Sequence, residues 1–309
     1  MRIVSLLPSA TEMVYALGLG DSLVGVSHEC DYPEGAKAKA KMIEPIFDTT
    51  KLSSERIDAL VIESMQQGKS IYRIRFEELR RANPDLIIMQ ELCDVCAIGA
   101  VDVLEAVNRL GKPLKVLSLN PHTLGGVQDD IRKVAEATDR KEEAGRVIAQ
   151  LNAKVERIKE ITEGASKTRV FCVEWLKPVM NAGHWVPEIL EYAGGFDELA
   201  TKGLPSTYVD WKRVLDYDPE VVVLMPCGFT TPRTIREATQ FLGLPNAKQL
   251  SAVRNGLVYA TDGHNYFSRS GPRLFDAIGI LAHMLHPDLF SQPLDPALGC
   301  KVDVAEAEA

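Results

Sequence analysis

Cysteines, histidines and acidic residues gather in a few short segments that follow apolar runs of the chain. These segments hold four of the six cysteines and three of the six histidines among the 309 residues. Thiolates, imidazoles and carboxylates ligate metals and transfer protons, so the segments predict a ligand, metal or catalytic site. The candidate residues in them are His28, Glu29, Cys30, Cys93, Cys96, Glu174, Trp175, His184, Trp185, Cys227, His264 and Tyr266.

The densest of these segments is a C-x-x-C motif, Cys93-Asp94-Val95-Cys96. Its two thiolates could share a metal or form a reversible disulfide, but a structural zinc site needs a second such pair and the sequence has none. Cys30, Cys227, His184 or His264 could complete a mixed site if the fold brings them close. The alternative is that these thiols are buried or merely line a cleft.

Each candidate histidine, aromatic residue and carboxylate also has a purely structural interpretation. A loop imidazole can simply bond a neighbouring backbone group, and large aromatic residues usually fill cores. His283 and His286 are best explained as residues that cap the last helix. In the functional interpretation, loop aromatics beside a cleft suit a large flat ligand. Glu174 could be a catalytic carboxylate, although no partner acid stands at a fixed spacing from it.

The elements that would position these residues form a repeated pattern. Pro84-Asp85-Leu86-Ile87-Ile88-Met89 runs into Cys93, and Pro219-Glu220-Val221-Val222-Val223-Leu224 runs into Cys227. Each apolar run is too short for a helix and follows a helical pattern, which indicates a buried parallel strand that ends in a functional loop. The repeat predicts two related α/β lobes, each Rossmann-like with a parallel sheet.

Other apolar runs extend this interpretation into a complete fold. Further strands are expected over 2–7, 22–27, 115–119, 168–173 and 257–260. Because ligands of parallel sheets bind outside the carboxyl ends of the strands, the candidate residues should meet in a cleft between the lobes. We expect a first lobe over 1–122, a long rigid helical connection over 123–166, a second lobe over 167–288 and a disordered tail over 289–309 that includes Cys300.

Composition argues against several classes of function. The formal net charge is −8 and the pI is about 5.4, without a basic cluster, which argues against a nucleic-acid partner. No apolar run approaches the ~20 residues of a membrane span, and the first run reaches Pro8 too soon for a secretory signal. We expect a cytoplasmic protein, or an extracytoplasmic one if a leader has been removed. Dinucleotide, Walker and serine hydrolase motifs are absent from the sequence.

A family resemblance is carried by the opening Ser5-Leu6-Leu7-Pro8-Ser9-Ala10-Thr11-Glu12 and by Ala16-Leu17-Gly18, Leu23-Val24-Gly25-Val26-Ser27 and Asp31-Tyr32-Pro33. The chain resembles the helical-backbone class (class III) of substrate-binding proteins, which serve ABC importers of cobalamin, haem and iron chelates. The cobalamin-binding proteins are the closest in pattern, over about residues 1–288. The resemblance implies two α/β lobes joined by one long helix, with the ligand between them and little hinge motion.

The resemblance also implies roles for individual residues. Family members surround the corrin with aromatic side chains, and the matching regions here hold Glu29, Phe47 and Tyr208, while Ser9 is a candidate ligand contact. Importers dock on one carboxylate of each lobe: Glu77 matches the first, whereas Lys212 stands where the second is expected. The cysteine-rich segments are not typical of exported members, so the chain resembles a leaderless cytoplasmic branch of the family.

The leading hypothesis is a protein that binds a small molecule without changing it. The ligand would be a cobalamin-like corrinoid or another metal chelate, such as haem or an iron–siderophore, held in the interlobe cleft. Trp175, Trp185, Tyr208 and Tyr266 would pack against the macrocycle. A thiolate or imidazole would approach the metal from Cys93, Cys96, His184 or His264.

Two alternatives stay open. The first is an enzyme that uses a bound transition metal or cluster on Cys30, Cys93, Cys96 and Cys227, with Glu174 as acid or base. The second is an importer component whose leader has been removed and whose partner is an ABC permease.

Overall fold

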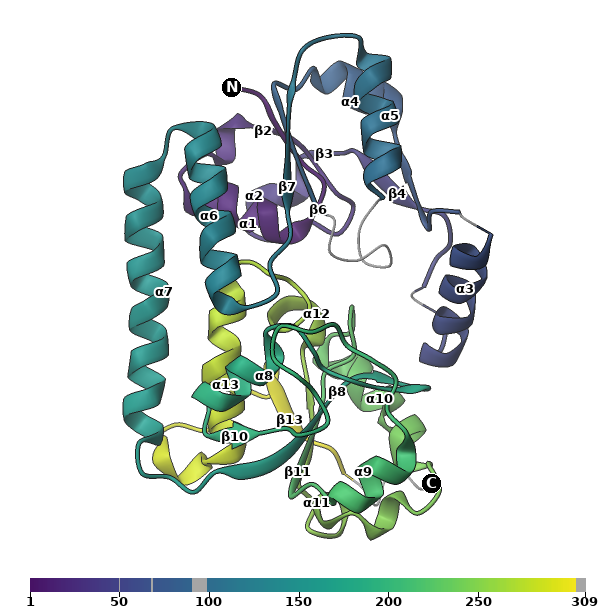
Figure 1. The fold of residues 1–309 in the computed structure, drawn as a ribbon, viewed down its shortest axis with the longest axis vertical. Helices are drawn as coiled ribbons and strands as arrows, with labels where there is room; N and C mark the ends of the chain where they lie inside the picture. Colours follow the sequence, from purple (N-terminus) through teal and green to yellow (C-terminus); the bar gives the residue numbers. More distant parts are fainter. Residues whose placement is uncertain (50, 68, 91–98, 304–309) are drawn as a thin grey trace. The chain divides into compact units, whose positions relative to one another are not determined.

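The structure is a computed structural model that describes residues 1–49, 51–67, 69–90 and 99–303 (Figure 1). Contacts between Cα atoms divide the chain into two compact units. Unit 1 comprises Met1–Leu52, Ala59–Pro121 and Gly125–Gln150, and unit 2 comprises Ser53–Asp58, His122–Leu124 and Leu151–Ala309. The predicted Cys93 and Cys96 lie outside the described residues.

Unit 1 is built on a five-stranded parallel sheet in the order β3-β2-β1-β6-β7. Its strands are β1 (Ile3–Ser5), β2 (Leu23–Val26), β3 (Ala40–Lys41), β6 (Leu86–Gln90) and β7 (Lys115–Leu119). A separate antiparallel pair joins β4 (Ile43–Pro45) to β5 (Tyr72–Ile74). The helices of this part of the chain are α1 (Pro8–Ala16), α2 (Glu34–Lys37), α3 (Ser54–Gln66), α4 (Phe76–Ala82), α5 (Ala100–Leu110) and α6 (Leu124–Thr138), with the 3-10 turn η1 (Gly20–Ser22).

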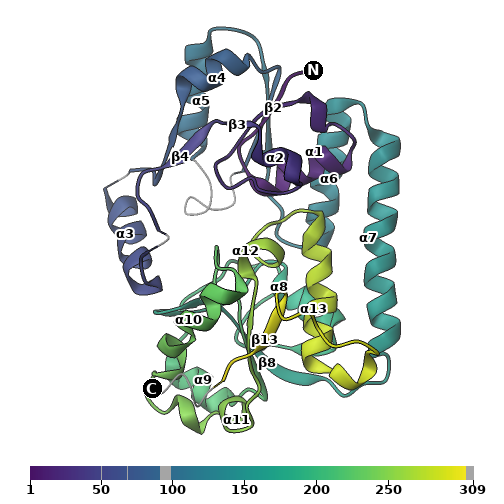
Figure 2. The same cartoon turned by 180° about the vertical axis from the view of Figure 1, so that it is seen from behind.

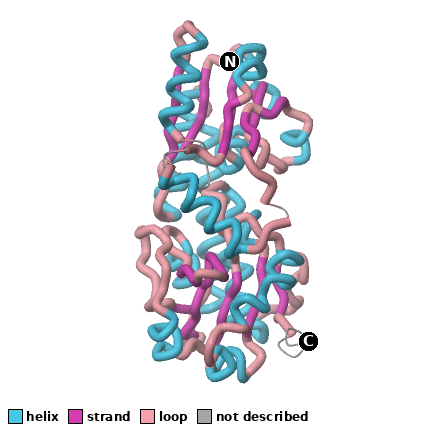
Figure 3. Tube along the Cα trace, turned by 90° about the vertical axis from the view of Figure 1, so that its right-hand side faces the viewer, coloured by secondary structure: helices cyan, strands magenta, loops and turns pink. Residues whose placement is uncertain are grey.

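Unit 2 is built on a second sheet in the order β10-β8-β11-β12-β13, with β9 paired to β8. Its strands are β8 (Thr168–Leu176), β9 (Val179–Asn181), β10 (Gly195–Phe196), β11 (Val221–Leu224), β12 (Val258–Thr261) and β13 (Gly299–Lys301). All neighbours are parallel except β9 and β13, which run antiparallel to their partners. Helices flank the strands of each unit (Figure 3). The sheets therefore have the predicted α/β class.

The remaining helices follow α6 along the chain. They are α7 (Lys141–Thr162), α8 (Val186–Tyr192), α9 (Trp211–Tyr217), α10 (Thr231–Leu242), α11 (Ser251–Arg254), α12 (Gly263–Tyr266) and α13 (Asp276–Leu285), with the 3-10 turns η2 (Ala247–Gln249), η3 (Pro272–Phe275) and η4 (Pro287–Leu289). In the described parts of the chain, no helix combines the length and apolar character needed to cross a membrane.

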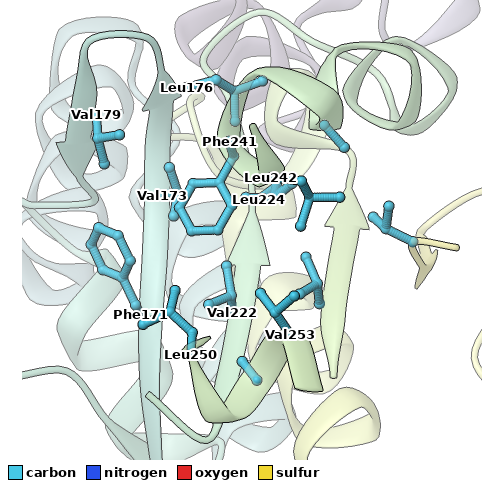
Figure 4. Packing of buried hydrophobic residues seen from close by; sticks show 14 of the residues in the cluster. Phe171, Val173, Leu176, Val179, Val222, Leu224, Phe241, Leu242, Leu250 and Val253 are labelled. Atoms are coloured by element: carbon cyan, nitrogen blue, oxygen red, sulfur yellow. The ribbon is translucent and has the colours of Figure 1, made fainter. Parts of the chain in front are cut away.

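Alternate residues of neighbouring strands form the core of unit 2. Phe171 and Val173 of β8 lie beside Val222 and Leu224 of β11, because the parallel register pairs them one to one. All four are fully buried and pack with Phe241 of α10 on the same face of the sheet (Figure 4). Burying an apolar side chain of this size contributes about 1.5–3 kcal/mol, so this face fixes the sheet against α10.

The repeated sequence pattern has a repeated structural role. In unit 1, the backbone N–H of Arg2 donates to Asp85 Oδ2 at 2.7 Å and its guanidinium donates to the Ala82 carbonyl at the end of α4. In unit 2, the N–H of Arg169 donates to Glu220 Oε2 at 2.9 Å and its guanidinium donates to the Asp218 carbonyl that follows α9. The acidic residue after each proline therefore holds the start of the neighbouring strand, at the end of the sheet opposite the candidate residues.

Two elements differ from the sequence-based expectation. The helical connection is two helices, α6 and α7, because Asp139 adopts a left-handed conformation (φ 58°) between them. Within unit 1, α6 and the first half of α7 lie side by side (Figures 1 and 2). The prediction of a disordered tail is wrong for its described part, since Cys300 pairs with Ala260 in the β12–β13 ladder and Val302 is buried in the core of unit 2.

Candidate functional site

Three neighbouring strands of unit 2 bring candidate residues to one edge of their sheet. β8, β11 and β12 are adjacent and parallel, so their carboxyl ends lie at the same edge, called here the carboxyl edge of unit 2. Backbone hydrogen bonds connect the segments there: Cys227 N–H donates to the Glu174 carbonyl at 3.1 Å, and His264 N–H donates to the Phe229 carbonyl at 3.0 Å. The edge carries Glu174, Trp175, Cys227, Phe229, His264 and Tyr266.

Glycine 263 makes the close approach of two of these segments possible. A Cβ atom at Gly263 would lie 2.4 Å from the Pro226 carbonyl oxygen and 2.6 Å from that of Met225. Both contacts are with backbone, which cannot move aside as a flexible side chain can. The start of α12 is then fixed by Asp262, whose side chain accepts a hydrogen bond from the Asn265 N–H at 2.8 Å.

Glu174 and Trp175 lie within β8, not after it as the sequence suggested, because the strand continues to Leu176 alongside β9. Glu174 Oε2 accepts a hydrogen bond from Ser206 Oγ at 2.7 Å, and that hydroxyl accepts one from the Gly183 N–H at 2.9 Å. The carboxylate is therefore held by a neighbouring loop.

Aromatic and basic side chains share the carboxyl edge of unit 2. The Trp175 ring centre lies 5.5 Å from that of buried Phe229, and the guanidinium of Arg233 stacks 3.7 Å from the centre of Phe229. Trp175 and Tyr266 are partly exposed, whereas the Trp175 Nε1 atom is buried with no hydrogen-bond partner among the described residues. The carboxyl edge of unit 2 therefore combines the flat apolar rings of Trp175 and Phe229 with the guanidinium group of Arg233.

Sequence reasoning missed the arginines of this edge. Arg233 forms an ion pair with Glu237 at 3.3 Å, Arg269 is buried beside His264, and Arg273 lies 5.7 Å from the Tyr266 ring centre. A sequence signal exists for them, since Arg233 lies in the first turn of the helix after the Cys227 segment, and Arg269 and Arg273 closely follow Tyr266.

A second group in unit 2 places His184 against His122, which sequence reasoning also missed. Their ring centres are 5.6 Å apart, and the Trp185 ring centre lies 5.4 Å from that of His184. Burial, and then the neighbouring His122, lower the pKa of His184. Trp185 itself is only 6% exposed and donates its indole N–H to the Phe267 carbonyl at 2.7 Å, so it offers little surface to a ligand.

Tyr208 is the most exposed of the candidate aromatics at 54%. Its hydroxyl donates to Asp58 Oδ1 at 2.8 Å, within unit 2. Partial burial, and then the bond to Asp58, raise the pKa of Tyr208 to about 12. The side chain therefore presents a neutral phenol ring at neutral pH and no phenolate for a metal.

The candidates of unit 1 lie near the carboxyl ends of β1, β2 and β4. The Cys30 thiol is buried and accepts a hydrogen bond from Thr11 Oγ1 at 3.1 Å, and Ser9 is buried in the first turn of α1. The His28 imidazole lies 3.4 Å from Glu29 and 5.3 Å from the Tyr72 ring centre. Phe47, just after β4, is half-buried.

The metal and docking candidates have less support in the structure. Among the described residues, no group of three or more His, Cys, Asp or Glu side chains could hold a metal ion. Cys227 is partly exposed, and ligation by Cys93 and Cys96 stays a prediction. Glu77 is exposed in the first turn of α4 and pairs with Arg80 at 2.8 Å, while Lys212 pairs with Asp216 on α9.

The structure has two α/β units, and aromatic and polar side chains gather at strand carboxyl ends, an arrangement typical of ligand-binding proteins. The chain belongs to the periplasmic binding protein family, and the sequence model of that family matches residues 3–264. The resemblance to the class III substrate-binding proteins of ABC importers is thereby confirmed, and the family favours a binding protein over an enzyme.

Known relatives match this chain over most of their length. A vitamin B12-binding protein of Vibrio parahaemolyticus is 25% identical over 279 residues, covering 90% of this chain and 86% of the relative. An ABC transporter substrate-binding lipoprotein of Bacillus subtilis, itself uncharacterised, is 24% identical and covers 94% and 82%. The solved structure of a periplasmic heme-binding protein of Pseudomonas aeruginosa superposes with a TM-score of 0.70 at 19% identity, covering 98% of each chain.

Proposed function

We propose that this protein binds a metal-containing macrocycle, a cobalamin-like corrinoid or haem, and releases it unchanged. The observation that carries the proposal is the carboxyl edge of unit 2, which carries the partly exposed Trp175 and Tyr266, with the Trp175 ring against buried Phe229. Flat aromatic faces next to each other suit a planar ligand, because stacked and edge contacts add to the burial of apolar area. Relatives that are named for binding vitamin B12 or heme support the same ligand class.

The binding test is an absorbance-monitored titration of reduced, metal-stripped protein with hydroxocobalamin and, separately, haemin. We expect saturable binding of one of them and recovery of the ligand unchanged after release. Trp175→Leu and Tyr266→Leu should each weaken binding about tenfold, which is about 1.4 kcal/mol. Trp211→Phe is the matched control, because the Trp211 indole bonds the Pro245 carbonyl next to α10 instead of lying at the carboxyl edge. Failure of both ligands to bind at tens of micromolar would refute the proposal.

The transport role is a further part of the proposal. We infer that an ABC permease receives the ligand from this protein, with Glu77 on the exposed start of α4 as one docking contact. The family supports a permease partner, whereas the sequence-based expectation of a cytoplasmic location does not. Fractionation of the source cells and determination of the mature N-terminus decide between them: protein found in the cytoplasm with Met1 retained would contradict the transport role.

A further inference from the structure

His122 and His184 form a pair of imidazoles in unit 2 that the proposed macrocycle contacts do not use. His122 comes three residues after β7, and His184 lies between β9 and α8. Their ring planes are inclined by 36° with the centres 5.6 Å apart, and both residues are partly exposed. Two segments distant in sequence thus bring two imidazoles into contact.

The backbone of His184 is held in an unusual conformation. Its φ is 50°, in the left-handed region that residues other than glycine rarely adopt. Two hydrogen bonds fix it there: His184 N–H donates to the Leu204 carbonyl at 2.6 Å, and Gly203 N–H donates to the His184 carbonyl at 2.8 Å. Such strain persists where surrounding contacts over-determine it, and it is concentrated at functional sites.

The imidazole of His122 carries an unsatisfied polar atom. Its Nδ1 is buried and has no hydrogen-bond partner among the described residues. Leaving a buried polar group unpaired costs about 1–3 kcal/mol, so an orphan nitrogen of this kind calls for an explanation.

We propose that His122 and His184 together bind one late first-row divalent metal ion through two imidazole nitrogens. The observed spacing is close to this arrangement, because two imidazoles with metal–nitrogen bonds of about 2.0–2.1 Å have ring centres about 4.5–5 Å apart, at adjacent octahedral or tetrahedral positions of one ion. Imidazole is a preferred ligand of nickel, copper and zinc. The inference goes beyond the proposed function and does not depend on which macrocycle is bound.

The remaining coordination positions must be filled by something other than these histidines. Among the described residues there is no third His, Cys, Asp or Glu grouped with the pair in a metal-binding arrangement. The other donors are therefore water, if a hydrated ion binds, or the atoms of a chelator that arrives with the metal and leaves two adjacent positions open. Both sources share the same two-imidazole chemistry at the protein.

The test uses the full chain without an affinity tag, titrated calorimetrically with Ni²⁺ alone and with Ni²⁺–nitrilotriacetate, which leaves two adjacent positions open. His184→Asn is the preferred variant, because asparagine tolerates the left-handed backbone that His184 adopts. His122→Gln removes the second imidazole. His283→Gln is the matched control, since His283 stacks on Phe290 with ring centres 3.6 Å apart, and its Nδ1 lies 2.8 Å from the Gly279 carbonyl.

We expect one equivalent of nickel, in at least one of the two forms, to bind the natural chain and the His283 variant equally. Each substitution in the pair should weaken binding about tenfold or more, the loss seen even for outer-shell changes at metal sites. Imidazole nitrogen NMR with diamagnetic Zn²⁺ gives a second readout, in which His122 and His184 signals shift together. Binding of the free ion, or of the nitrilotriacetate complex alone, distinguishes the two sources. Binding that survives both substitutions, or no binding of either form, overturns the proposal.

Discussion

Asp197, just after β10, shows how burial controls a single carboxyl group. Its oxygens accept hydrogen bonds from the backbone N–H groups of Cys172 at 3.0 Å and Leu199 at 2.8 Å. Burial outweighs these two donors and raises the pKa of Asp197 to about 6, against an ordinary value of 3.8. The folded state therefore holds this proton more tightly than the unfolded chain does.

The sign of the resulting pH dependence follows from linkage. Between about pH 4 and pH 6 the folded chain binds more protons at Asp197 than the unfolded chain, so the free energy of unfolding falls as the pH rises through this window. The free energy of unfolding falls by about 2–3 kcal/mol over the window, because each unit of pKa difference at Asp197 corresponds to about 1.4 kcal/mol. Below and above the window, this group contributes no slope.

Asp197→Asn should remove that slope. Urea unfolding at pH 4.5, 5.5, 6.5 and 7.5 measures it, with Asp129→Asn as the control because Asp129 forms an exposed pair with Arg132. The absolute stability of the Asn variant can be lower, since one of the two backbone donors loses its oxygen acceptor. An unchanged slope in the Asn variant would mean that Asp197 does not carry the effect.

At the scale of elements, the two copies of the strand pattern share one clamp. Asp85 accepts the backbone N–H of Arg2, just before β1, and Glu220 accepts that of Arg169, the second residue of β8. The two guanidinium groups bond carbonyls at the ends of α4 and α9. Asn83 and Asp218, which end α4 and α9, share a left-handed φ of 43° and 45°. The sequence repeat therefore corresponds to the same hydrogen-bond arrangement in both units, at the amino ends of the strands.

Glu220→Ala should loosen β8, and Asp85→Ala should loosen β1, each by about 0.5–1 kcal/mol for one lost hydrogen bond. Hydrogen exchange measured by mass spectrometry on peptides covering 168–176 and 1–7 tests this locally. Each variant serves as the control of the other, because the two clamps lie in different units. Equal acceleration of both peptides in either variant would show that the loss is global and that the acidic residue has no local role.

Strands with a continuous apolar run could be predicted from the sequence. Strand segments that depend on pairing with a distant part of the chain could not. β6 and β11 were expected within one or two residues, because strands buried on both faces leave uninterrupted apolar runs. β7 was expected over its observed range, although it is only partly buried. β8 extends past Val173 because β9 pairs with it, although Glu174 interrupts the run. β13 has no sequence signature, since its three residues are ordered by pairing with β12.

The candidate site was predictable to the same extent. The rule that ligands gather at the carboxyl ends of parallel strands placed Glu174, Cys227 and His264 at one edge. It could not show that Trp185 turns into the core or that His122 meets His184, because both contacts join segments far apart in the chain. Local patterns identify the loop that carries a residue, whereas the partner of that residue depends on packing.

At the scale of the whole molecule, the tryptophans report on one unit alone. Trp175, Trp185 and Trp211 are the three tryptophans of the chain, and all lie in unit 2. Helices of both units contribute to far-UV circular dichroism, so the two signals follow different parts of the molecule. Chains of several domains often unfold in more than one step, which makes this difference useful.

A ligand that binds the carboxyl edge of unit 2 should therefore stabilise the transition seen by tryptophan fluorescence. At 100 times its Kd, a ligand that binds only the folded state adds about 2.7 kcal/mol, and a domain of 150–250 residues gains about 2–4 °C in Tm for each kcal/mol. The expected rise is about 5–10 °C with hydroxocobalamin or haemin, after correction for absorption by the ligand. The ligand-induced rise in Tm should be smaller in Trp175→Leu, because this substitution removes an aromatic ring from the carboxyl edge of unit 2. A rise in the circular dichroism transition without one in fluorescence would instead place the ligand on unit 1, near Ser9, His28 and Phe47, because no tryptophan lies there.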